Sequence, residues 1–142
     1  MSDRDKKIQT RISIRQAVKK GDIKRVETLL SEGANVNEKE FSYTPLHWSA
    51  INGHADVSKV LLENGANVNE KDEDGRTALH WSAINGHADV SRVLLENGAN
   101  VNAVDIWKEA PLHLTAGYGR IDDMKLLMLN GANVNALNNN DS

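Results

Sequence analysis

Apolar residues recur at helical spacing in the segment Ala55–Glu63. Val57, Val60 and Leu61 fall at positions i, i+3 and i+4, so they share one face of a predicted helix whose other face is polar. Gly65 follows, and glycine commonly ends a helix because it tolerates a positive φ angle. The pattern therefore predicts an amphipathic helix that buries one side.

A shorter helix is predicted just before this one. Thr44 offers a hydroxyl N-cap, and Pro45 takes the first helical position, where its missing N–H costs nothing. The helix is expected to run through Trp48 to Ile51, and Gly53 then breaks it. Neither helix is long enough to be stable alone in water, so each must pack on a neighbour.

The same pattern returns along the chain at a nearly fixed interval. The string GANVN begins at Gly33, Gly65, Gly98 and Gly131, so successive copies lie 32, 33 and 33 residues apart. The polar residues 67–77 contain an Asp-Gly pair, which favours a tight hairpin. A unit of helix, turn, helix and hairpin-like loop is thus repeated, and such units stack into a solenoid.

The unit resembles the ankyrin repeat. Its fullest copy reads Gly-x-Thr-Ala-Leu-His-x-x-Ala-x-x-Gly-His over residues 75–87 and Val-Leu-Leu-x-x-Gly-Ala-x-x-Asn over residues 93–102. The resemblance implies an all-α, ankyrin-repeat helical solenoid with β-hairpin-like loops, forming a single domain over residues 1–142. We expect repeats at 8–40, 41–72, 73–105 and 106–137, with polar tails at 1–7 and 138–142. The family resemblance also implies non-catalytic binding of a protein partner.

Composition narrows the class of partner. A net charge of −3 and a pI near 5.9 give no reason to expect nucleic-acid binding, which usually needs a basic stripe. No apolar run is long enough to span a bilayer, and no apolar segment of a signal peptide follows the charged start. We expect a monomer without cofactors that acts inside a cell, in the cytoplasm, the nucleus or a host cell into which it is delivered.

Histidine and hydroxyl side chains raise the question of a catalytic or metal site. The resemblance makes His47, His80 and His113 scaffold residues that hydrogen-bond the motif threonine and neighbouring backbone. A zinc site needs three or four convergent ligands, whereas the solenoid separates these histidines by a full repeat. Ser49 and Ser82 would act as nucleophiles only beside an activating base. We therefore expect no enzyme activity and no metal.

The aromatic residues suggest a binding surface instead. The chain has three Trp, two Tyr and one Phe, and the resemblance places them on the inner helix face or the hairpin tips. Exposed aromatic residues on one face commonly mark a recognition surface. The alternative is that Trp48 and Trp81 pack between repeats. The predicted partner-binding residues are Phe41, Tyr43, Trp48, Ile51, Asn52, Arg76, Trp81, Ile84, Asn85, Ile106, Trp107 and Tyr118.

Departures from the repeat pattern carry further expectations. Arg25 and Thr28 replace apolar residues in the first unit, as a polar N-terminal cap would require. Asp123 replaces an apolar residue in the fourth unit in a cap-like way, although the apolar Leu129 does not fit a cap. Lys108 stands where the preceding unit has glycine, so we expect its turn to be strained or remodelled.

Two alternatives to a natural adaptor or effector remain open. Residues 47–69 and 80–102 differ only at Lys59 against Arg92, which indicates either recent duplication or an engineered, consensus-type scaffold. Ankyrin repeats of similar sequence are also substrates of an asparagine hydroxylase in animal cells. The candidate modification sites under that second alternative are Asn37, Asn69, Asn102 and Asn135.

Overall fold

The computed structural model describes residues 14–135. The predicted tails, together with residues 8–13 and 136–137 of the predicted outer repeats, lie outside this range. Residues 14–20 are helical. The helices that follow are α2 (Ile23–Ser31), α3 (Pro45–Asn52), α4 (Ala55–Glu63), α5 (Ala78–Asn85), α6 (Ala88–Glu96), α7 (Pro111–Tyr118) and α8 (Ile121–Leu129).

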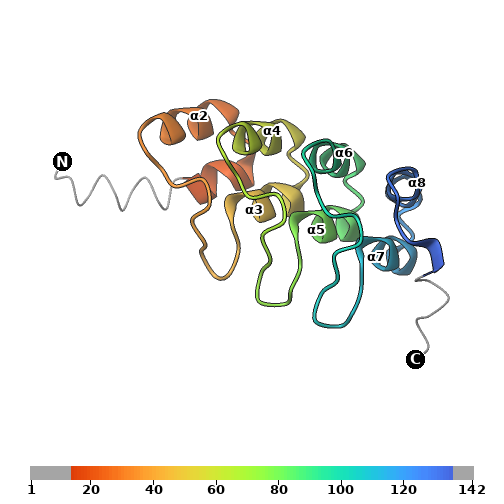
Figure 1. The fold of residues 1–142 in the computed structure, drawn as a ribbon. Coiled ribbons are helices and arrows are strands. Elements are labelled where there is room, and N and C mark those ends of the chain that lie inside the picture. The colour runs from red at the N-terminus through yellow and green to blue at the C-terminus, as the bar shows by residue number, and fades with distance from the viewer. Residues whose placement is uncertain (1–13, 136–142) are drawn as a thin grey trace.

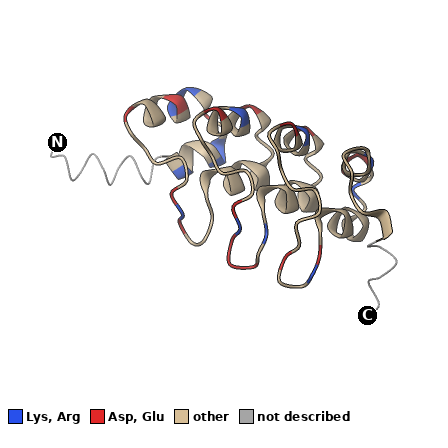
Figure 2. Cartoon of the chain, viewed as in Figure 1, with Lys and Arg blue, Asp and Glu red and all other residues tan. Residues whose placement is uncertain are grey.

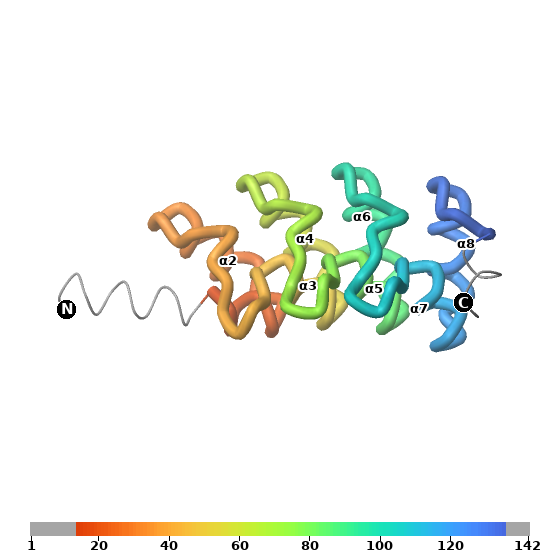
Figure 3. The backbone as a smooth tube through the Cα atoms, turned by 60° about the horizontal axis from the view of Figure 1, so that its bottom comes forward, coloured from red at the N-terminus to blue at the C-terminus, as the bar shows by residue number. Residues whose placement is uncertain are grey.

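These helices form two parallel rows (Figure 1). The inner row consists of residues 14–20, α3, α5 and α7, and the outer row consists of α2, α4, α6 and α8. From α2 onward, contacts join each helix to the next in its row, such as α3 to α5 and α4 to α6. The loops between units project from one side and follow one another along the stack (Figure 3). The predicted all-α solenoid with hairpin-like loops is confirmed.

Local sequence sets the ends of the inner helices as predicted. The Thr44 side chain accepts a hydrogen bond from the His47 N–H, and the His47 ring Nδ1 accepts one from the Thr44 N–H at 3.0 Å. These bonds satisfy two backbone donors at the start of α3. At the other end, Gly53 adopts φ +77°, the left-handed conformation that closes a helix.

The core lies between the rows and between successive units. Val57 and Leu61 of the predicted stripe are buried, and so are their counterparts Val90 and Leu94 in α6. Val60 is partly buried and packs against the same cluster. Because each outer helix buries its stripe on adjacent units, the short helices gain from packing the stability that they lack alone.

The first hairpin differs from the next two because it is one residue shorter. The second closes with Asp72 N–H on the Arg76 carbonyl and leaves a three-residue loop that ends in Gly75. In the first, Glu40 and Tyr43 exchange both backbone hydrogen bonds around a two-residue turn. The turn residues Phe41 and Ser42 have φ angles of +54° and +76°, which are unfavourable for residues other than glycine. This turn directs Phe41 into solvent.

Candidate functional site

The motif histidines join one repeat to the next. The Nδ1 atoms of His47 and His80 accept hydrogen bonds from threonine N–H groups, so the ring proton is on Nε2. His47 Nε2 then donates to the Arg76 carbonyl and His80 Nε2 to the Glu109 carbonyl, each at 3.0 Å. Burial lowers the pKa of both histidines, which favours the neutral ring that this geometry needs. Both ring nitrogens of each histidine are therefore engaged in hydrogen bonds that stabilise the stacked repeats.

A second set of contacts sits at the turn glycines. A Cβ atom added to Gly21 would lie 2.7 Å from the His54 ring, and one on Gly53 would lie 2.7 Å from His87. His54 Nε2 is also 2.9 Å from the Lys19 carbonyl, in the preceding repeat. Glycine is needed here for close approach as well as for positive φ. The second pair of histidines is therefore structural too.

The motif asparagines make a third set. The Asn69 side chain donates to the Gly98 carbonyl at 3.2 Å and accepts from the Asn100 N–H at 2.8 Å, in the following repeat. Asn37 and Asn102 make the same pair of bonds one repeat earlier and one repeat later. These three candidate hydroxylation sites thus have both ends of the amide group engaged. Asn135, the fourth, lies where the described residues end.

We expect Asn69→Ala to lower the free energy of unfolding by about 1–2 kcal/mol, because two hydrogen bonds between repeats are lost. Asn135→Ala is the matched control: its side chain makes no such bond to a following repeat within residues 14–135. Urea unfolding of both variants measures the difference. Equal effects of the two substitutions would show that the bonds between repeats contribute nothing.

The inner-helix serines pair with serines of the outer helices. The Ser49 and Ser58 hydroxyls are 2.8 Å apart, and Ser82 and Ser91 are 2.7 Å apart in the next repeat. Each first serine also donates to a backbone carbonyl of its own helix. Within residues 14–135, no three His, Cys, Asp or Glu side chains are grouped so that they could hold a metal ion.

Tryptophan packing differs from the simple prediction of exposed aromatic rungs. Trp48 and Trp81 are half-buried and pack against the core cluster. Tyr43 lies between them, with ring centroids 5.0 Å from Trp48 and 6.0 Å from Trp81. Both tryptophans therefore combine a packing role with an exposed edge, so neither the exposed-surface prediction nor the packing alternative describes them fully.

Arg76 binds two indole rings at once. Its guanidinium carbon lies 5.2 Å from the Trp81 ring centroid and 5.1 Å from that of Trp107, so cation–π contacts hold all three side chains. Arg76 Nε also contacts the buried carboxylate of Asp105 at 3.2 Å. The Trp81 indole N–H donates to Asp72 at 2.9 Å. The result is a fixed cluster that joins the second and third hairpins.

Sequence reasoning missed the part that two aspartates play in this cluster. Asp72 accepts hydrogen bonds from the N–H groups of Asp74 and Arg76, and Asp105 does the same in the next hairpin for Trp107 and Glu109. Both aspartates are buried, although Asp72 occurs in a charged stretch typical of a solvated loop. The detectable signal was their recurrence, one repeat apart, just before each three-residue loop.

The remaining predicted binding residues divide by exposure. Phe41, Ile106 and Trp107 are 78%, 62% and 56% exposed on the hairpins, and Tyr118 is exposed at the end of α7. Asn52 is also exposed, whereas Ile51 and Asn85 are half-buried. The prediction for Ile84 is wrong. Only 8% of it is exposed, because the stacking of α5 between α3 and α7 covers it.

Asp123 is not the exposed polar residue that a C-terminal cap would require. It occupies the slot of Val57 and Val90, which faces the preceding repeat, and only 1% of it is exposed. Its equivalent in the first unit, Arg25, is exposed because no described unit precedes it. Neither carboxylate oxygen of Asp123 makes a hydrogen bond of good geometry in residues 14–135, although the Ser91 side chain of the preceding repeat lies close enough to favour the charged form. Burial raises its pKa, against smaller opposing effects of nearby polar and basic side chains.

The expectation for Lys108 is confirmed. It adopts φ +61° at the loop position where the preceding hairpin has Gly75 at φ +72°. The hairpin keeps the same closing bonds, with Lys108 N–H donating to the Asp105 carbonyl at 3.0 Å. The three-residue turn is thus retained with lysine in a conformation that favours glycine.

Comparison with known families agrees with this architecture. A family model described as ankyrin repeats in three copies matches residues 14–105 and again residues 72–138. None of the helices within residues 14–135 is both long enough and apolar enough to cross a membrane. Family match, repeated unit and stacked helices lead to one conclusion: the chain belongs to the ankyrin-repeat family.

Proposed function

We propose that the chain binds a protein partner without catalysis, through a surface on the hairpin side of the inner row. The observation that carries the proposal is the exposure of large apolar side chains on the first and third hairpins, with Arg76 fixed beside one of them. Trp, Tyr and Arg dominate binding energy at protein interfaces. This recognition surface comprises Phe41, Asn52, Arg76, Ile106, Trp107 and Tyr118.

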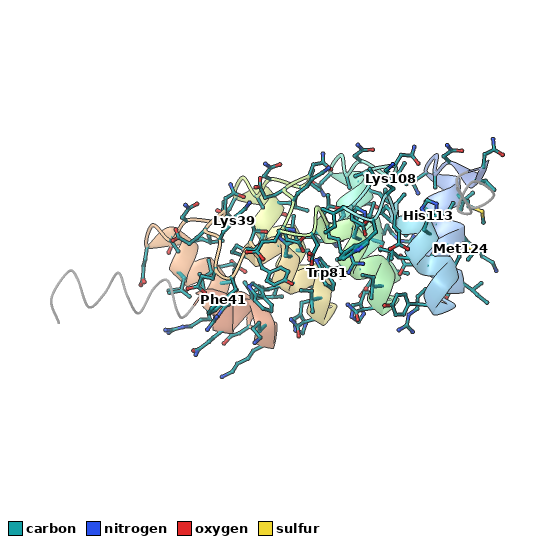
Figure 4. All side chains as sticks on the ribbon, turned by 90° about the horizontal axis from the view of Figure 1, so that it is seen from below. Lys39, Phe41, Trp81, Lys108, His113 and Met124 are labelled. Atoms are coloured by element: carbon teal, nitrogen blue, oxygen red, sulfur yellow. The ribbon has the colours of Figure 1, made fainter. Side chains whose placement is uncertain are left out.

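The surface is held rigid before any partner arrives. Trp107 stacks on Arg76, whose charge is paired with Asp105. The backbone of Phe41 is held in a tight turn, and the Arg15 guanidinium carbon lies 5.4 Å from its ring centroid. Side chains that are already ordered lose little conformational entropy on binding. Figure 4, which looks onto the hairpin side, shows Phe41 near one end of this face and Trp81 near its middle.

We expect the double variant Phe41→Ala with Trp107→Ala to abolish capture of the partner from a lysate of the source cell. Both side chains are mostly exposed, so the helical circular dichroism signal and the melting temperature should change little. Quantitative mass spectrometry of captured proteins measures the loss. Trp81 is unsuitable for this test, because its burial and its bond to Asp72 would mix stability with binding.

The matched control is Ile121→Ala with Leu129→Ala, which removes exposed apolar side chains from α8 in the outer row. We expect this variant to capture the same proteins as the unmodified chain. If the two double variants lose the same proteins, binding depends on general apolar exposure. If neither loses any, the recognition surface on the hairpin side has no role.

A further inference from the structure

Charge is distributed unevenly along the inner row. Helices α3, α5 and α7 contain no Lys, Arg, Asp or Glu. Residues 14–20 contain Arg15, Lys19 and Lys20 and no acidic residue. Figure 2 shows this contrast as blue segments at the N-terminal end of an otherwise uncharged row. The row therefore presents positive charge at one end only, in a chain whose net charge is −3.

One of these cations is already paired. Arg15 Nε lies 3.2 Å from a carboxylate oxygen of Glu40, on the first hairpin. Lys19 and Lys20 are exposed. The Lys19 ammonium lies 5.0 Å from the Trp48 ring centroid, at the edge of the next inner helix. A charged and aromatic site thus lies directly beside the recognition surface.

The third repeat shows which group completes such a site. There, Trp81 has a cation, Arg76, over its ring and a carboxylate, Asp72, on its indole N–H at 2.9 Å. A tryptophan with both a cation and a carboxylate is therefore an arrangement that this fold already stabilises.

The equivalent Trp48 has the cation, Lys19, but lacks the carboxylate. Its indole N–H is buried and has no acceptor in residues 14–135. Glu40 stands in the place of Asp72. Its Oε2 lies 3.2 Å from Arg15 Nε, although neither of these two atoms completes a hydrogen bond in residues 14–135. Trp48 also lines one small pocket together with Arg15 and the acidic Glu38 and Glu40. An acidic group of a partner would therefore meet the exposed Lys19 and Lys20 outside this pocket.

We propose that the site formed by Lys19, Lys20 and Trp48 binds an acidic side chain of the partner, which makes the partner segment acidic at one end and apolar toward Trp107. This inference rests on the proposed function and specifies the chemistry of the same surface. Complementary charge of this kind selects partners and fixes their register more than it adds affinity.

The test begins with selection of random 12-residue peptides displayed on phage against the immobilised chain. Selected peptides are then synthesised, and their binding is measured by fluorescence anisotropy. We expect enrichment of Asp and Glu, weaker binding at higher salt, and at least tenfold weaker binding to the variant Lys19→Glu with Lys20→Glu. The matched control, Lys59→Glu with Arg92→Glu, makes the same change of charge on α4 and α6 and should alter binding less than twofold.

The outcomes separate the two proposals. Suppose that the selected peptides require Phe41 and Trp107. The acidic-partner inference alone is then overturned if these peptides show no acidic enrichment, or if they bind the Lys19→Glu, Lys20→Glu variant normally. Peptides that bind the Phe41→Ala, Trp107→Ala variant unchanged overturn the recognition surface and this inference with it. Unchanged helical signals and melting temperatures establish that each variant is folded.

Discussion

Replacing His80 by alanine is expected to lower the free energy of unfolding by about 3–4 kcal/mol. The side chain is fully buried, so truncation leaves a cavity. It also removes the acceptor of the Thr77 N–H and the donor to the Glu109 carbonyl, which leaves polar groups without partners in and around the core. Equilibrium unfolding in urea, followed by circular dichroism, measures the loss.

A substitution at the C-terminal end of the same helix provides the control. Asn85→Ala removes one hydrogen bond to a carbonyl of its own helix and breaks no bond between repeats. We expect it to cost less than about 1 kcal/mol. A His80→Ala variant no less stable than Asn85→Ala would contradict the assignment of the motif histidines to the joints of the stack.

Replacing Asp123 by valine is expected to raise the free energy of unfolding by about 2–3 kcal/mol at neutral pH. The substitution restores the residue found at Val57 and Val90 and removes a buried carboxylate that makes no hydrogen bond of good geometry in the described chain. Urea unfolding at pH 7.5 measures the gain. The mirror substitution Val90→Asp, in the same slot one repeat earlier, should destabilise the protein.

The pH dependence of this gain distinguishes charge from shape. Because burial raises the pKa of Asp123 above its ordinary value near 3.8, the folded state binds the proton more tightly than the unfolded state. Asp123 therefore destabilises the folded state least when the pH is below its ordinary pKa. The destabilisation grows as the pH rises through the pKa of the folded state. The advantage of Asp123→Val over the unmodified chain should therefore be smaller at pH 4 than at pH 7.5. If the gain in the free energy of unfolding were equal at the two pH values, the destabilisation by Asp123 would not come from burying a charged carboxylate.

Features that depend on neighbouring residues in the chain could be predicted from the sequence. The predicted helix Ala55–Glu63 has these bounds in the structure, because its stripe and its flanking glycine lie within one unit. The predicted helix starting at Thr44 ends one residue later than expected, at Asn52. Fold class followed from the repeat period, since a repeated unit with two short amphipathic helices has few ways to bury them.

Features that depend on contacts between units could not be predicted in the same way. Asp123 faces the preceding repeat, and only the stack reveals which face of a helix that is. Trp81 is partly withdrawn from solvent because Asp72, nine residues earlier in the chain, accepts its indole N–H. The Arg76 contact with Trp107 joins residues from successive hairpins, which no periodicity within one unit specifies.

The identity of residues 47–69 and 80–102, apart from Lys59 and Arg92, has a consequence for how the gene can change. Adding or deleting one whole unit of this kind by recombination would leave a protein with the same repeating sequence. Each added unit would again contact its neighbours through a histidine, a glycine and an asparagine. His47, Gly53 and Asn69 make these contacts between the existing repeats. The length of the array, and with it the reach of its binding face, can therefore evolve in whole steps without new joints having to arise.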